Sequence, residues 1–197
     1  MTQPAWALGF GDDVWWSRLA QPNQHGWVDA EATYKLQELT RPTADLDPKA
    51  LACDGLLVRP GPQQADQMWL RFVAGRPVRA VTIDFLAWCS AQLAAHGFTA
   101  LLLIWDNASW HRSQAVHSWI RQHNQKIKHG ATGVRLIVCH WPSKSPWLNP
   151  IEPQWVHGKR AVSEPDRLLS AAELEARVYA YYGCACEAHL VMPKKVA

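Results

Sequence analysis

The chain has 197 residues, of which 48% are hydrophobic and 19% charged, a composition that fits a single globular domain and excludes a disordered chain. Its apolar runs stay well below the roughly 18 residues of a transmembrane helix, and the first residues lack the pattern of a secretory signal. The five cysteines form no CxxC pair, and an odd count without a signal favours a reducing, cytoplasmic compartment.

Positive charge gathers in the middle of the chain. Lysine and arginine outnumber aspartate and glutamate by 20 to 17, which gives a net charge of +3. Residues 107–160 hold eight of the basic side chains and one acid, Glu152, together with six of the nine histidines. A basic stretch with a single carboxylate favours a polyanionic partner, although a solvated basic face has the same composition.

Apolar periodicity predicts a run of strands followed by alternating helices and strands. Strands are expected at residues 5–10, 14–19, 51–59, 68–73, 100–105 and 134–139, with Gly11-Asp12-Asp13 as the turn between the first two. Helices are expected at residues 82–96, 112–128, 150–162 and 170–182. Thr82 is the predicted N-cap of the first helix, and Ser170 and Glu173 form a capping box at the last. The stretches 21–50 and 142–150 are expected to be loops.

The order of these elements predicts the architecture. The early strands can pair antiparallel, whereas strands separated by helices join in parallel through crossovers. The expected fold is α/β, a mixed sheet with helices on both faces, in one domain. This is the element order of a ribonuclease-H-like fold, and several other α/β folds share parts of it.

Three acidic residues occupy positions suited to a catalytic site. Asp12 is expected at the end of the first strand, Asp106 at the carboxyl end of a buried strand, and Glu152 at the start of a helix. If the two strands are neighbours, the three carboxylates meet at one edge of the sheet. Such hard oxygen ligands suit Mg²⁺ or Mn²⁺, and a pair of ions would serve phosphodiester cleavage.

Each of these acids also has a purely structural interpretation. Asp12 and Asp13 can be ordinary turn residues, and Asp106 can belong to a strand-to-helix turn. The sequence Asn149-Pro150-Ile151-Glu152 is typical of a helix N-cap, a proline at the first helical position and a capping-box glutamate. Position alone leaves both interpretations open.

Two motifs carry a resemblance to a known family. The first is Trp105-Asp106-Asn107-Ala108-Ser109-Trp110-His111, and the second runs from Pro142 to Trp155 and contains Ser145-Pro146-Trp147-Leu148-Asn149-Pro150-Ile151-Glu152. In this order they resemble the DDE-type transposases of bacterial insertion sequences. More narrowly, they resemble the insertion-sequence six-thirty family, which is related to mariner transposases.

The resemblance implies a ribonuclease-H-like catalytic domain whose catalytic and metal-binding triad is Asp12, Asp106 and Glu152. It implies an endonuclease, dependent on Mg²⁺ or Mn²⁺ and using two ions, that cuts DNA at the terminal inverted repeats of an element and transfers the strand to target DNA. It also implies a homodimer on DNA, cytoplasmic in a bacterium and nucleoid-associated when bound. On the same basis residues 1–183 form the catalytic domain, residues 184–197 a C-terminal tail, and the helix-turn-helix domain of full-length relatives is absent.

The sequence departs from the family pattern at two points. Relatives commonly have Asp-Glu at the first acid, whereas this chain has Asp12-Asp13, so either aspartate can be the first metal ligand. Asp106 and Glu152 are separated by 45 residues, more than is usual in mariner relatives. The surplus is expected around residues 122–133.

Further residues near the motifs are candidates for supporting roles. Asn107 and His111 are expected to position the scissile phosphate or a water, or else to cap the following helix. Phosphate contacts are expected from Lys144, Asn149, Lys159 and Arg160, with surface solvation as the alternative. Four of the 12 tryptophans are expected in the core: Trp69, Trp88, Trp119 and Trp155. Three others are candidates to stack on an unpaired base: Trp110, Trp141 and Trp147.

Two other functions stay open beside the transposase. One is a catalytically inactive, DNA-binding transposase remnant, which would bind DNA without metal-dependent activity. The other is a ribonuclease-H-like nuclease without strand transfer, which a pre-cut 3′-hydroxyl end would distinguish from a transposase.

Overall fold

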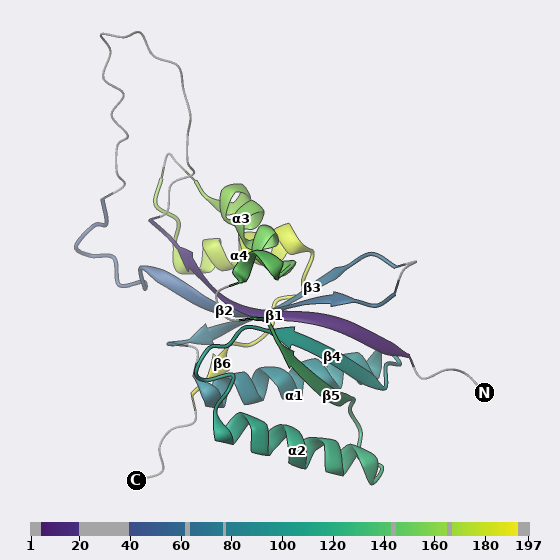
Figure 1. The fold of residues 1–197 in the computed structure, drawn as a ribbon. Helices are drawn as coiled ribbons and strands as arrows, with labels where there is room; N and C mark the ends of the chain where they lie inside the picture. Colours follow the sequence, from purple (N-terminus) through teal and green to yellow (C-terminus); the bar gives the residue numbers. More distant parts are fainter. Residues whose placement is uncertain are drawn as a thin grey trace, which may run out of the picture.

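A mixed six-stranded sheet with helices on both faces forms the described part of the protein (Figure 1). The structure is a computed structural model that describes residues 5–19, 40–61, 64–76, 78–142, 145–164 and 167–192. Its strands are β1 Trp6–Ser17, β2 Ala50–Arg59, β3 Gln67–Ala74, β4 Ala100–Trp105, β5 Arg135–His140 and β6 Leu190–Val191. Their order across the sheet is β5-β4-β1-β2-β3-β6.

Strand direction follows the prediction. β1 pairs antiparallel with β2, and β2 pairs antiparallel with β3. β1 pairs in parallel with β4, and β4 pairs in parallel with β5. The α/β mixed sheet expected from the element order is therefore confirmed.

The first strand differs from the prediction. β1 is one strand of 12 residues, so Asp12 and Asp13 lie within it and not in a turn. Gly11, Asp12 and Asp13 are weak strand formers in isolation, but pairing overrides that preference, because Asp12 lies opposite Gly55 and Asp13 opposite Asp54 on β2. The side chains of Leu103 and Trp105 fill the space above Gly11.

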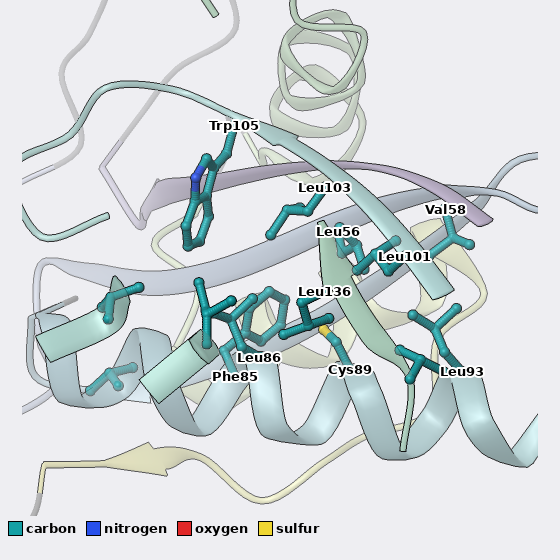
Figure 2. Close-up of a cluster of buried hydrophobic side chains, with 14 of the residues drawn as sticks. Leu56, Val58, Phe85, Leu86, Cys89, Leu93, Leu101, Leu103, Trp105 and Leu136 are labelled. Carbon is teal, nitrogen blue, oxygen red and sulfur yellow. The ribbon is translucent and has the colours of Figure 1, made fainter. Parts of the chain in front are cut away.

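Two pairs of helices cover the two faces of the sheet (Figure 1). α1 Arg79–Ala95 and α2 Gln114–Lys128 pack on one face, and α3 Ile151–Val162 and α4 Ala171–Tyr182 pack on the other. Figure 2 shows the core beneath the first pair, where leucines of β2, β4 and β5 meet Phe85, Leu86, Cys89 and Leu93 of α1. The second core is aromatic, with Trp16, Trp155 and Tyr179 all buried.

The helix ends agree with the sequence except at α1. Its N-cap is Val78 and not Thr82, whose hydroxyl lies in the first turn and donates to the Val78 carbonyl at 3.3 Å. The helix starts earlier because Val81 continues the buried face and is itself fully buried. α2 begins two residues later than predicted, and the capping box of α4 is confirmed.

The remaining segments add little to the sheet. The loop predicted at residues 21–50 lies mostly outside the described residues, and its described part, 40–49, forms turns and bends. The proline-rich loop contains one 3₁₀ turn, η1 Pro146–Leu148. Leu190 and Val191, a strand too short to predict, pair with the end of β3. In the described segments, every helix is too short or too polar to span a bilayer.

Candidate active site

Strand pairing brings two of the three acids to one place. β1 and β4 run in parallel, and Phe10 lies opposite Ile104. Two residues further along come Asp12, within β1, and Asp106, just after the end of β4, close enough for the charge of Asp106 to act on Asp12. Phe10 and Ile104 belong to the core beneath α3 and α4, so Asp12 faces that pair of helices.

The third acid comes from the first turn of α3. Trp155 anchors this helix: it is buried, packs edge-on against Trp16 at 6.0 Å, and its Nε1 donates to Asp12 Oδ2 at 2.9 Å. The indole lies over Gly55, where a Cβ atom would collide with it. Because Glu152 precedes Trp155 by three residues, it lies on the same side of the helix, toward the sheet edge.

The three carboxylates repel one another. Burial and then the charge of Glu152 raise the pKa of Asp12 to about 7; Asp13 and Asp106 add to this, and the Trp155 hydrogen bond opposes it. Burial also raises the pKa of Glu152, with Asp106 adding to the shift and Lys159 opposing it. The positively charged and hydrogen-bonding groups around the site therefore do not neutralise all of its negative charge.

His111 fixes the position of Asp106. Its ring stacks on Trp105 with a centroid distance of 4.2 Å, and its Nδ1 donates to Asp106 Oδ1 at 2.7 Å. The Ala108 N–H donates to the same oxygen at 3.0 Å. Burial alone would raise the pKa of Asp106, but these hydrogen bonds outweigh it and the pKa is lowered. Asp106 is therefore a fixed, ionised carboxylate.

Asn107 ties the end of β4 to the segment after β5. Its Nδ2 donates to the Trp141 carbonyl at 2.6 Å, and His140 Nδ1 donates to the Asp106 carbonyl at 2.9 Å. Neither Asn107 nor His111 caps the next helix, because the N-cap of α2 is Ser113. Both residues hold the Asp106 segment in place, and their expected role in positioning the scissile phosphate or a water stays a prediction.

Asp13 faces the opposite side of the sheet from Asp12. Its Oδ1 lies 3.8 Å from His111 Nε2, and burial raises its pKa while His111 opposes the shift. Across the β1–β2 pair lies Asp54, which is 6% exposed and whose Oδ2 has no hydrogen-bond partner in the described residues. Burial and then the charges of Asp13 and Asp12 raise the pKa of Asp54 to about 8. Of the three aspartates on β1 and β2, only Asp12 lies on the same face of the sheet as Glu152.

The capping-box interpretation of Glu152 is wrong. The N-cap of α3 is Pro150, and no side chain forms a capping hydrogen bond there. Pro153 is tolerated because it stands in the first turn, where the backbone N–H has no acceptor within the helix. Glu152 thus has no capping role in its own helix.

The predicted phosphate-binding residues lie in different surroundings. Lys159 and Arg160 are exposed in the last turn of α3. Asn149 is buried at 3% exposure and its Oδ1 accepts a long hydrogen bond, 3.5 Å, from the Ile151 N–H. Lys144 lies outside the described residues.

A cavity of about 380 Å³ opens beside the acids. Asp106 and Glu152 line it, together with Asn107, Ala108, Trp141, Pro142, Ser145 and Asn149. Across the ranges that the structure describes, no three His, Cys, Asp or Glu side chains are already grouped closely enough to hold a metal ion. Asp106 and Glu152 therefore face a common space, and Asp12 lies outside its lining.

The candidate tryptophans separate into buried and exposed residues. Trp155 is 3% exposed, and Trp69, Trp88 and Trp119 pack against the core as expected. Trp141 stacks on Phe10 with a centroid distance of 6.1 Å, and Trp110 is half-buried. Trp147 is 75% exposed.

The sequence reasoning missed Asp54, although one signal was present. An aspartate in the otherwise apolar stretch Ala50–Arg59 is unusual, because a strand buried on both faces rarely carries an unpaired acid. Its neighbour Gly55 also went unremarked, yet it makes room for Trp155. Both features concern pairing partners, which lie about 40 residues away along the chain.

Comparison with known structures gives one recurring neighbour. The chain superimposes on Mos1 transposase in a paired-end complex with the left transposon end, with a TM-score of 0.64 and 15% identity over 91% of this chain. It also matches the Mos1 mariner paired-end complex with Mn, with a TM-score of 0.60 and 14% identity over 91% of this chain. In each case the chain spans 48% of the Mos1 chain. These likenesses confirm the ribonuclease-H-like fold.

Sequence comparison gives the family. A comparison with curated proteins finds no match. The profile of the DDE superfamily endonucleases matches residues 72–175, a range that contains Asp106 and Glu152 and covers more than half of the chain. The chain therefore belongs to the family of DDE superfamily endonucleases.

Proposed function

We propose that the chain is the catalytic domain of an insertion-sequence transposase, which cuts DNA at the element ends and transfers the strand to target DNA. One observation carries the proposal: Asp12 of β1, Asp106 at the end of the adjacent parallel strand and Glu152 of α3 lie close together, and burial of Asp12, with the charges of Glu152 and Asp106 adding to it, raises the pKa of Asp12 to about 7. Uncompensated acids at the carboxyl end of a strand are typical of a site that needs a cation.

The donor set fits a hard divalent cation. Carboxylate oxygens are the ligands that Mg²⁺ and Mn²⁺ prefer, and a cation would relieve the repulsion among Asp12, Asp106 and Glu152. One of the Mos1 structures that the chain resembles is a paired-end complex with Mn. Two bound ions would supply activation of the attacking oxygen and stabilisation of the leaving oxygen.

The residues of the chain have separate tasks in this proposal. Asp12, Asp106 and Glu152 hold the cations, and Asp12 takes this role in preference to Asp13 because it shares a face with Glu152. His111 and Asn107 keep Asp106 and its segment fixed while DNA enters and leaves. Asn149 lines the cavity from within, and Lys144, Lys159 and Arg160 bind phosphates from outside.

The partners follow from the same reasoning. The substrates are the terminal inverted repeats of the element and a target DNA, and two chains act together because transposition joins two ends. The Mos1 structures that this chain resembles include a paired-end complex with the left transposon end and a strand transfer complex. The host is a bacterium, and the chain acts in its cytoplasm and on its nucleoid.

A pre-cut DNA end tests the proposal. The chain is incubated with Mn²⁺, a labelled duplex that ends in a free 3′-hydroxyl, and a supercoiled plasmid. A transposase joins the label to the plasmid, and Asp12→Asn, Asp106→Asn or Glu152→Gln abolishes the joining. Asp84→Asn is the matched control, because it removes an exposed carboxylate of α1 and should leave the joining unchanged.

The open arrangement of the acids favours one alternative, an inactive DNA-binding remnant. Among the described residues no three His, Cys, Asp or Glu side chains are grouped closely enough to hold a metal ion, which is what a decayed site would show. A remnant would bind the duplex but show neither nicking nor joining in Mn²⁺. Nicking without joining would instead identify a nuclease that lacks strand transfer.

A further inference from the structure

Trp147 is the most exposed tryptophan in the part of the chain that the structure describes. It is 75% exposed, against 53% for Trp6 and 3% for Trp155. The next residue, Leu148, is also exposed, at 43%. A large aromatic side chain gains free energy from burial, so one kept in solvent beside a polar cavity suggests a contact with another molecule.

The backbone holds Trp147 at the rim of the cavity that Asp106 and Glu152 line. The 3₁₀ turn that carries it is closed by a hydrogen bond from the Leu148 N–H to the Ser145 carbonyl at 3.1 Å. Ser145 and Asn149, on either side of the turn, line the cavity together with Glu152. Asn149 and Ile151 are buried and fix the end of the turn, so the backbone of Trp147 is held between two residues that line the cavity.

The size of the cavity points to a single strand. A volume of about 380 Å³ is at the lower end of the range that holds one small ligand, which matches one nucleotide and not a duplex. A nucleotide that is locally separated from its partner strand fits a space of this size. When its phosphate enters the cavity, the base next to that phosphate lies unpaired near the rim, with both of its faces free.

We propose that Trp147 stacks on an unpaired nucleobase beside the scissile phosphate. This inference rests on the proposed function, because it takes DNA as the substrate of the cavity. Every base has an aromatic face, so the stacking recognises the unpaired state more than the sequence. It also needs no cation, whereas phosphate entry into an acidic cavity does, so base stacking anchors a frayed end before the cations are bound.

The test compares frayed and paired DNA ends. Two labelled duplexes share one sequence and differ only in whether the last three or so base pairs are mismatched, and binding to the full chain is measured in EDTA and in Mn²⁺. Base stacking contributes about 1–3 kcal/mol, so Trp147→Ala is expected to weaken binding to the frayed end by about 5- to 150-fold. Binding to the paired end should change by less than about twofold, and Trp147→Phe should retain most of the preference.

Trp6→Ala is the matched control. Trp6 is also exposed, but it lies at the amino end of β1, six residues before Asp12, which is about 20 Å along a strand. Its replacement should leave both affinities unchanged. In parallel, 2-aminopurine in the frayed position should lose fluorescence on binding to the wild type and to Trp147→Phe, and not on binding to Trp147→Ala.

The outcomes separate this inference from the proposed function. An equal effect of Trp147→Ala on frayed and paired ends overturns the inference, even where DNA joining proceeds. If Trp147→Ala instead abolishes self-association in sedimentation, the residue is a contact between copies of the chain and the inference fails. If the frayed-end preference depends on Trp147 and no joining is found, the stacking site stands and the transposase proposal falls.

Discussion

Replacing Asp54 with asparagine should stabilise the protein by an amount that grows with pH. Asp54 is buried in β2, opposite Asp13, and borders a cavity of about 20 Å³, roughly the size of one water molecule. Burial, with the charges of Asp13 and Asp12, raises its pKa from 3.8 to about 8. Asparagine keeps the shape and does not ionise, so the change removes one titration and little packing.

The direction follows from proton uptake. The folded chain holds the Asp54 proton up to about pH 8, whereas the unfolded chain releases it near pH 3.8. Between these values the folded state binds more protons, so Asp54 makes the free energy of unfolding fall as pH rises. The effect is absent below the unfolded pKa, grows through the window, and becomes constant above about pH 8.

The magnitude is a few kcal/mol. One pKa unit corresponds to about 1.4 kcal/mol, and at pH 7 roughly three units of the shift are expressed, which gives about 4 kcal/mol. At pH 4 the same calculation gives about 0.5 kcal/mol. The gain from Asp54→Asn should therefore increase by about 3–4 kcal/mol between pH 4 and pH 7, a large part of the stability of one domain.

Urea unfolding in EDTA at several pH values between about 4 and 8 measures this gain. Asp84→Asn, at an exposed position of α1, is the control and should change stability little at any pH. In an Asp13→Asn background the effect of Asp54→Asn should shrink, because the charge opposite Asp54 is gone. A gain that does not vary with pH would refute the reasoning and show that solvent reaches the Asp54 carboxyl in the folded state.

Three further predictions concern the site. Gly55→Ala should destabilise the fold by about 1–3 kcal/mol and displace α3, because the added Cβ would collide with Trp155. Gly61→Ala is the control, since its added Cβ meets open space and should not destabilise the fold. Urea unfolding compares the two variants. Affinity for Mn²⁺, measured by calorimetry, should rise with pH up to about 7, where Asp12 loses its proton. Asp12→Asn should weaken binding and flatten that rise. A rise that persists in Asp12→Asn would exclude the Asp12 carboxyl as a metal ligand. Lys159→Ala and Arg160→Ala, each in a fluorescence-anisotropy titration against salt, should lower the slope of log K against log[salt] by about one, and an unchanged slope would remove that residue from the DNA interface.

The order of elements and the positions of Asp106 and Glu152 could be predicted because both depend on local signals. The apolar run at residues 100–105 ends at Asp106, and the structure ends β4 at Trp105. α3 begins at Ile151, one residue from the predicted start. In these segments the apolar periodicity, the buried face and the residues that end the element all predict the same boundaries.

The long first strand could not be predicted, because its cause is distant in sequence. Locally, Gly11, Asp12 and Asp13 are typical of a turn, and what keeps them extended is β2, whose residues 54–56 pair with them. The choice between Asp12 and Asp13 depended on the same information. Once β1 is a continuous strand, alternation alone puts Asp12 on the face of α3 and Asp13 on the face of α1.

Because β1 has two faces, the site has two groups of acids, and one side chain, His111, contacts both groups. Asp12 and Glu152 lie on the α3 face, and Asp13 and Asp54 on the other. His111 connects them, because its Nδ1 holds Asp106 while its Nε2 faces Asp13. A change at Asp13 therefore reaches Asp106 through the imidazole, in addition to its direct charge effect on Asp12, and only the part that reaches Asp106 should be lost once His111 is replaced.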